Sequence, residues 1–200
     1  MKLFGFILIA LVFSSTLSAE EITTEEIIKM LQQGGYILYV RHGATDLSQA
    51  DSDFSDLRNC NKQRNLSEQG IKDSRKLGEA IRKFNIQVDR VISSPYCRCV
   101  DTAIFAFNKV EIDNQLRAIL NENAEVTQKL IDSLSVKLKA LPPPGSNTVL
   151  VSHTANLREV TNIWPKPEGV VHIFKPSGDN YQHIGRITPV QWQQHLTQDK

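Results

Sequence analysis

The sequence predicts an α/β fold, a three-layer sandwich in which helices cover both faces of a mostly parallel central sheet. Strand-like apolar segments alternate with amphipathic helix-like segments along most of the chain, an order typical of parallel strands joined through helices. The segment "YILYV" at 36–40 is apolar at every position, as expected for a strand buried on both faces. The length of 200 residues with 40% hydrophobic residues fits one globular domain.

The charge pattern excludes one class of partner. Basic residues are spread among nearly equal numbers of acidic residues, and the formal net charge is +1. No basic segment is evident, so no nucleic-acid partner is expected.

The first 19 residues have the pattern of a secretory signal peptide. Lys2 precedes an apolar run from Leu3 to Phe13, and small residues lead up to Ala19. The alternative is a transmembrane anchor, but the apolar run is shorter than the roughly 20 residues that span a bilayer. We therefore expect a signal peptide over 1–19, a mature domain over 20–200 without a membrane anchor, and a periplasmic or secreted protein.

The three cysteines are Cys60, Cys97 and Cys99. An exported chain can form disulfides, and three cysteines allow one bridge and one free thiol. Cys97 and Cys99 are too close in sequence to pair comfortably. The sequence therefore predicts a bridge from Cys60 to Cys97 or to Cys99, with free buried thiols as the alternative. No fourth ligand stands at a spacing typical of zinc, so no metal site is expected.

The first predicted elements are a helix over 23–33 and the strand at 36–40. Thr23 and Glu26 stand at the spacing of a capping box, and Gly34 is expected to end the helix.

A polar stretch over 44–65 follows the first strand and is long enough to suggest a functional loop or lid. The next helix is predicted to begin after Ser67 as N-cap. Its apolar spacing predicts that it buries Ile71, Leu77 and Ile81.

The remaining elements continue the alternation and end in a hairpin. In order, they are a strand over 88–94, a helix over 96–107, a short strand over 110–113, a helix over 125–141, a strand over 147–153 and two hairpin strands over 169–174 and 181–187.

Polar residues follow three of these strands at the point where each strand ends. Arg41 and His42 follow the first strand, the second leads into Ser93, Ser94 and Arg98, and His153 ends a later one. Ligands of such sheets bind outside the carboxyl ends of the strands. Each residue taken singly could be a surface or ion-paired group, but together they predict an anion site. Guanidinium groups bind phosphoryl oxygens in pairs, and a neutral imidazole is a nucleophile near neutral pH.

Four motifs in order resemble the histidine phosphatase superfamily, also called phosphoglycerate-mutase-like. They are "VRHGATD", "NLSEQGIKDSRKLGEAI", "ISSPYCRCVDTA" and "VLVSHTANLREV", and they span residues 36–160. The stretches "CNKQRNLSEQG" and "SSPYCRC" are similar to an exported bacterial subgroup. The resemblance implies the phosphoglycerate-mutase-like fold and a phosphatase chemistry without metal or other cofactor.

The resemblance also assigns roles. It implies that His42 is the nucleophile that becomes phosphohistidine, with Arg41, Arg98 and His153 around the phosphoryl group. Arg64 and Asn65 stand where the family often has a further phosphate contact. For Asn65 the alternative is a role in the loop before a helix.

The general acid is the least defined part of the pattern. Some branches of the family place a carboxylate directly after the second histidine, but this chain has Thr154 there. Other branches use a glutamate after the third strand, which makes Glu122 the nearest candidate, with Glu125 and Asp46 next. The alternative for Glu122 is a stabilising position at a helix start.

These observations predict an exported, metal-independent phosphomonoesterase that acts through a phosphohistidine intermediate. The alternatives are a phosphomutase and a non-catalytic module that binds a phosphorylated ligand. The expected partner is a phosphorylated small molecule or an envelope glycan, and a phosphosugar, a lipopolysaccharide core phosphate and a nucleotide remain open.

Overall fold

The structure is a computed structural model, and it describes residues 22–197. Its strands are β1 (Ile37–Arg41), β2 (Val88–Ser93), β3 (Glu111–Ile112), β4 (Asn147–Ser152), β5 (Val171–Pro176) and β6 (Tyr181–Ile187). Its α-helices are α1 (Thr24–Gln33), α2 (Glu68–Lys83), α3 (Cys97–Phe107), α4 (Ala124–Lys139), α5 (Thr154–Thr161) and α6 (Pro189–Thr197). Short 3₁₀ turns lie at Cys60–Lys62, Asn114–Leu116 and Ile119–Asn121.

The strands form one sheet in the order β3-β2-β4-β1-β5-β6. The pairs β3–β2, β2–β4 and β4–β1 are parallel, whereas β5 pairs antiparallel with β1 and with β6. The predicted mostly parallel sheet and the C-terminal hairpin are therefore confirmed. Because β2, β4 and β1 are adjacent and parallel, their carboxyl ends meet at one edge.

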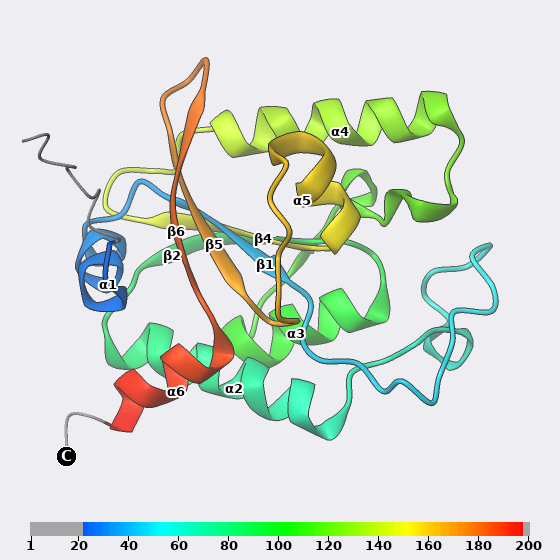
Figure 1. The fold of residues 1–200 in the computed structure, drawn as a ribbon, viewed down its shortest axis with the longest axis horizontal. Coiled ribbons are helices and arrows are strands. Elements are labelled where there is room, and N and C mark those ends of the chain that lie inside the picture. The colour runs from blue at the N-terminus through cyan, green and yellow to red at the C-terminus, as the bar shows by residue number, and fades with distance from the viewer. Residues whose placement is uncertain (1–21, 198–200) are drawn as a thin grey trace, which may run out of the picture.

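Helices cover both faces of this sheet (Figure 1), with α4 and α5 on one face and α2, α3 and α6 on the other. The strand β1 shows why both faces must be covered. Leu38 and Val40 belong to the core cluster under α2 and α3, and Ile37 and Tyr39 belong to the cluster under α4. All four side chains are almost completely buried. The three-layer sandwich is thus confirmed.

The local signals for helix starts are confirmed as well. Thr23 and Glu26 form the capping box of α1, and Gly34 ends that helix with a positive φ of 77°. Ser67 caps α2 by accepting a hydrogen bond from the backbone N–H of Gly70. One expectation was wrong: Ile71 is only half-buried, because the buried side of α2 is formed by Gly70, Ser74, Leu77 and Ile81 and Ile71 lies on the surface side with Lys72 and Arg75.

Two short helices, α5 and α6, were not predicted. The helix α5 has eight residues and α6 has nine, too short for a clear helical period. Among residues 22–197, no helix is both long and apolar enough to cross a bilayer. The predicted signal peptide over 1–19 lies outside the described residues.

The start of α2 packs tightly under the loop that follows β1. A Cβ added to Gly70 would come within 2.0 Å of the carbonyl oxygen of Ala44. Only glycine permits this approach. The motif "NLSEQG" therefore sets the path of the chain directly after His42.

Candidate active site

The two motif histidines meet at the carboxyl ends of β1 and β4. Arg41 stands opposite Ser152 in the parallel register, and the backbone N–H of His42 donates to the Ser152 carbonyl at 3.1 Å. His42 and His153 are the residues that directly follow these positions. Their ring centroids are 5.6 Å apart, so a group the size of a phosphoryl can contact both imidazoles.

His42 is buried and held as a neutral imidazole. Its Nδ1 and the carbonyl oxygen of Gly43 are 3.0 Å apart. An oxygen acceptor requires the hydrogen on Nδ1, which leaves the lone pair on Nε2. Burial, together with the nearby guanidinium groups of Arg98 and Arg41, lowers the pKa of His42 to about 3. The ring is therefore a nucleophile at neutral pH.

His153 is fixed from two directions. Its Nε2 shares a hydrogen bond of 2.8 Å with the hydroxyl of Ser94, and its backbone carbonyl accepts a hydrogen bond of 2.7 Å from the hydroxyl of Tyr39. The edge of the Tyr96 ring packs against the imidazole, with centroids 4.9 Å apart. Burial holds the pKa of His153 well below its usual value, and so do electrostatic coupling with His42 and the guanidinium charges of Arg98 and Arg41.

Three arginines, Arg41, Arg64 and Arg98, surround these histidines. All three lower the pKa of both His42 and His153, which places their charges close to the two rings. Among the described residues, the Nε atom of each arginine is buried and has no hydrogen-bond partner. Buried polar groups are almost always satisfied. A bound phosphoryl group would supply oxygens for these donors, and we call the three residues the arginine cradle.

Two carboxylates orient the cradle. Arg41 donates from Nη2 to Glu168 at 2.8 Å, and Glu168 also accepts from the backbone N–H of Thr45 at 3.0 Å. Arg98 donates from Nη1 to Asp51 at 2.9 Å, and Asp51 also accepts from the backbone N–H of Arg64. Sequence reasoning missed both carboxylates. Asp51 lies in the polar stretch already singled out, whereas "PKPEGV" around Glu168 carries no recognisable signal.

Thr102 connects the turn after His42 to the first turn of α3. Its hydroxyl accepts a hydrogen bond from the backbone N–H of Gly43 at 2.9 Å and donates one to the carbonyl of Arg98 at 2.6 Å. The threonine of the motif "SSPYCRCVDTA" therefore ties the turn after His42 to the first turn of α3.

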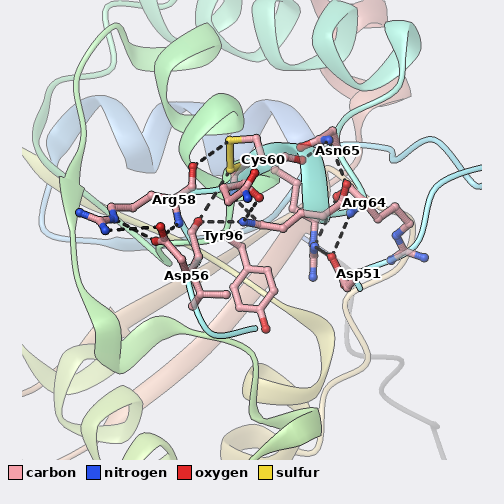
Figure 2. Close-up of a disulfide and its surroundings, with 12 residues drawn as sticks. Asp51, Asp56, Arg58, Cys60, Arg64, Asn65 and Tyr96 are labelled. Carbon is pink, nitrogen blue, oxygen red and sulfur yellow. Dashed lines mark hydrogen bonds and ion pairs between the residues drawn. A yellow bond between two sulfur atoms is a disulfide. The ribbon is translucent and has the colours of Figure 1, made fainter. Parts of the chain in front are cut away.

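A disulfide holds the polar loop beside this site (Figure 2). It joins Cys60 to Cys97, which decides between the two pairings that the sequence left open. Gln63 reinforces the link, because its Oε1 accepts from the backbone N–H of Cys97 at 3.0 Å and its Nε2 donates to the carbonyl of Leu57 at 2.8 Å. The residue after Cys97 is Arg98, so the loop and the cradle are fixed to each other.

Cys99 is free and fully buried, with its sulfur 3.6 Å from Nε2 of His153. Burial raises the pKa of this thiol to about 12. It therefore stays protonated and acts as packing beneath the imidazole rather than as a nucleophile.

The structure does not bring every predicted residue to the cradle. The amide nitrogen of Asn65 donates to the carbonyls of Cys60 and Gln63, so this side chain shapes the loop. Asp46 accepts hydrogen bonds from Ser48. These contacts leave Arg64, rather than Asn65, as the loop residue that faces the histidines.

The two predicted glutamates also lie outside the cradle. Glu125 pairs with Lys129 on the exposed face of α4. Glu122 pairs with Arg117 and lines a cavity that also includes Tyr96. Within residues 22–197, no group of three or more histidine, cysteine, aspartate or glutamate side chains could hold a metal ion.

Comparisons with known proteins bear on the family and the fold. A family model described as histidine phosphatase superfamily (branch 1) matches residues 37–130. No curated protein sequence matches the chain. Solved structures share its fold. The protein histidine phosphatase SixA, complexed with tungstate, has 15% identity and a TM-score of 0.51, and the alignment covers 78% of this chain and 97% of that one.

Two further structures show the same fold. A mycobacterial glucosyl-3-phosphoglycerate phosphatase has 14% identity and a TM-score of 0.57 over 76% of this chain and 98% of its own. The α-ribazole phosphatase from Shigella flexneri has 13% identity and a TM-score of 0.57 over 77% of this chain and 96% of its own.

Proposed function

The chain belongs to the histidine phosphatase superfamily, and from this premise we propose that it is a phosphomonoesterase that passes a phosphoryl group through His42 to water. The observation that carries the proposal is the position of a neutral, buried His42 among three arginines whose Nε atoms have no hydrogen-bond partner within residues 22–197. A nucleophile and a set of cationic donors are the two parts that phosphoryl transfer requires.

In the first step, Nε2 of His42 attacks phosphorus and the bond from phosphorus to the leaving oxygen breaks. The leaving oxygen takes up a proton and departs as an alcohol. Water then attacks the phosphohistidine, the nitrogen–phosphorus bond breaks, and inorganic phosphate leaves with His42 restored. Arg41, Arg64 and Arg98 stabilise the charge on the non-bridging oxygens in both steps, as preorganised donors do.

We propose Glu122 as the proton donor of the first step, once it has left its ion pair with Arg117 and taken up a proton. It lines a cavity together with Tyr96, the residue packed against His153. General-acid help is worth about 10²- to 10⁴-fold for a poor leaving group. Glu122→Gln should therefore slow hydrolysis of an alkyl phosphate far more than hydrolysis of p-nitrophenyl phosphate, whose leaving group needs little help. Equal, small losses on both substrates would assign the proton to His153 or to water instead.

Metal independence and export belong to the same proposal. Cationic side chains occupy the place where other phosphotransferases use a metal ion, so activity should persist in EDTA. The Cys60–Cys97 disulfide supports an oxidising compartment outside the cytosol. Mass spectrometry of protein from the periplasm or medium should find a mature chain that begins at Glu20. A chain that retains Met1 and appears only in the cytosol would contradict export.

The deciding experiment is to trap the intermediate. Purified protein is mixed with p-nitrophenyl phosphate in EDTA and denatured during turnover, and the peptide that contains His42 is examined for acid-labile, base-stable phosphate. We expect phosphate on His42 and none in His42→Asn. Normal turnover by His42→Asn would refute the mechanism. Tungstate binding without turnover of any phosphomonoester would instead favour the alternative, a module that binds a phosphorylated ligand.

A further inference from the structure

A cavity of about 580 Å³ has Tyr96 in its wall, the residue that also contacts His153 and Arg98 of the phosphate centre formed by the two histidines and the arginine cradle. Its walls come from two segments that are distant in sequence, the disulfide-tethered loop with Phe54, Asp56 and Arg58, and the segment with Arg117 and Glu122. Its volume is within the range of pockets that bind small molecules. We call it the side cavity.

Tyr96 is the connection between the side cavity and the phosphate centre. The residue lines the cavity, and its ring contacts both His153, with centroids 4.9 Å apart, and the guanidinium of Arg98, which lies 4.5 Å from the ring centroid. A phosphate held by Arg98 therefore has the side cavity as its neighbour. In Figure 2, Tyr96 lies between the Asp56–Arg58 pair and the group that contains Asp51 and Arg64.

The loop that forms one wall of the side cavity is held by hydrogen bonds and by a disulfide. The carbonyl of Leu57 accepts a hydrogen bond from Nε2 of Gln63. Oε1 of the same side chain accepts one from the backbone N–H of Cys97. The Cys60–Cys97 disulfide closes the same loop. These links hold the wall at a fixed position beside Arg98, as a specific subsite requires.

The charges of the side cavity differ from those of the arginine cradle. Arg58 is paired with Asp56 at 2.9 Å, and Arg117 is paired with Glu122. The four side chains carry two positive and two negative charges, so they give no net attraction to a second phosphate or carboxylate. The same side chains and the amide of Asn114 present paired donors and acceptors, which suit adjacent hydroxyl groups.

The side cavity also has an apolar surface. Phe54 is 43% exposed and Ile112 is 61% exposed, and both line it together with Pro95. An exposed aromatic ring beside charged groups suits a ligand with an apolar ring face and polar edges. A sugar ring has this combination, since its C–H groups form the face and its hydroxyls the edge.

We propose that the side cavity is the leaving-group subsite and that it takes an uncharged, hydroxyl-rich ring, so the substrate is a sugar monophosphate without a second anionic group. The proposal rests on the proposed function. It is separable from that function because the subsite can be measured by binding alone.

The test uses His42→Asn, which cannot form the phosphohistidine, and isothermal titration calorimetry with three probes: glucose 6-phosphate, glucose 1,6-bisphosphate and methyl phosphate. We expect glucose 6-phosphate to bind at least about tenfold more tightly than methyl phosphate. Glucose 6-phosphate has a sugar ring that reaches the side cavity, whereas methyl phosphate has none. The bisphosphate should bind no more tightly than glucose 6-phosphate. Adding Phe54→Ala to His42→Asn should lower the ratio of the affinity for glucose 6-phosphate to that for methyl phosphate by about five- to tenfold.

Leu141→Ala provides the matched control. Leu141 is an apolar side chain that is 70% exposed, and it lines a different cavity together with Ile37 and Thr148 at the opposite ends of the strands. This variant should leave the preference unchanged. Equal affinity for glucose 6-phosphate and methyl phosphate, or a preference for the bisphosphate, would overturn the subsite. Absence of turnover in the native protein would refute the proposed function and leave the binding result standing.

Discussion

The protein contains two pairs of neighbouring histidines, and only one of them has the features of a catalytic centre. His42 and His153 lie at the carboxyl ends of two parallel strands with ring centroids 5.6 Å apart. His172 and His183 lie on the antiparallel strands β5 and β6 with ring centroids 5.2 Å apart. Spacing alone therefore does not distinguish them.

Burial does not distinguish them either. It lowers the pKa of His42 to about 3 and that of His172 to about 4. The hydrogen bonds of the two pairs differ in their partners. Nδ1 of His172 and Nε2 of His183 are hydrogen-bonded to each other at 3.0 Å, while Nε2 of His172 is buried without a partner among the described residues. His42 instead makes its hydrogen bond with the backbone through Nδ1 and keeps Nε2 available.

The surroundings complete the contrast. The first pair faces three arginines whose Nε atoms are unpartnered among the described residues. Beside the second pair, Arg186 donates to the carbonyl of Lys166. A low pKa thus reports burial, and an unpartnered ring nitrogen is present in both pairs among the described residues. The three arginines beside the first pair are what a phosphoryl-transfer site requires in addition. Four measurements test this difference between the two histidine pairs.

The largest expected effect comes from the nucleophile. His42→Asn should reduce turnover of p-nitrophenyl phosphate by about 10⁴-fold or more, because no group remains to accept the phosphoryl. His172→Asn is the matched variant in the second pair and should keep turnover within about twofold after correction for the folded fraction. Similar losses in both variants would show that the second pair also takes part in the reaction.

The arginines should show the next largest effect. Arg98→Ala removes a preorganised donor and should lower kcat by about 10²- to 10³-fold. It should also weaken tungstate binding, measured by calorimetry. Arg186→Ala, beside the second pair, should change neither quantity. An unaltered kcat in Arg98→Ala would mean that the cradle does not hold the phosphoryl group.

The disulfide should affect stability and the first pair together. Replacing both Cys60 and Cys97 with serine should lower the free energy of unfolding by about 2 to 4 kcal/mol, since the unfolded chain gains freedom. Urea denaturation measures this loss. Tungstate affinity should fall as well, because Arg64 and Asp51 lie in the released loop. Unchanged stability and affinity would show that Gln63 and the loop packing suffice.

The smallest effect is the pH dependence of stability. The folded protein keeps His172 neutral to about pH 4, whereas the unfolded chain takes up the proton near the ordinary pKa of 6.5. The unfolded state therefore binds more protons between these values, and stability is lost as pH falls through this window. His172 should contribute a loss of about 1 to 2 kcal/mol between pH 7 and pH 5, and His42 a similar one.

The variants separate these contributions. Urea denaturation at both pH values should show a smaller pH-dependent loss in His172→Asn and in His42→Asn than in the native protein. Only His42→Asn should also lose turnover. An undiminished pH dependence in His172→Asn would contradict the burial of a neutral ring in the second pair.

Sequence patterns alone predicted the α/β order and the polar residues at the ends of the strands. The capping box of Thr23 and Glu26 is a local interaction and could be read directly. Arg41, His42 and His153 could be placed together because parallel strands end at one edge of a sheet. Hydrophobic period is a property of short segments, and the alternation of strands with helices along the chain predicts parallel pairing. Both can therefore be read from the sequence without the folded structure.

Long-range contacts in the folded chain establish which side chains complete the site. Asp51 and Glu168 are 47 and 127 residues from the arginines they orient, and no periodicity links residues at such separations. The choice of Cys97 over Cys99 depended on the direction of the first turn of α3, which buries Cys99 beneath His153. Asn65 was drawn into the loop because its amide satisfies backbone carbonyls there. Such contacts depend on how irregular segments cross in space, and the need to satisfy each buried polar group fixes them only once the chain is folded.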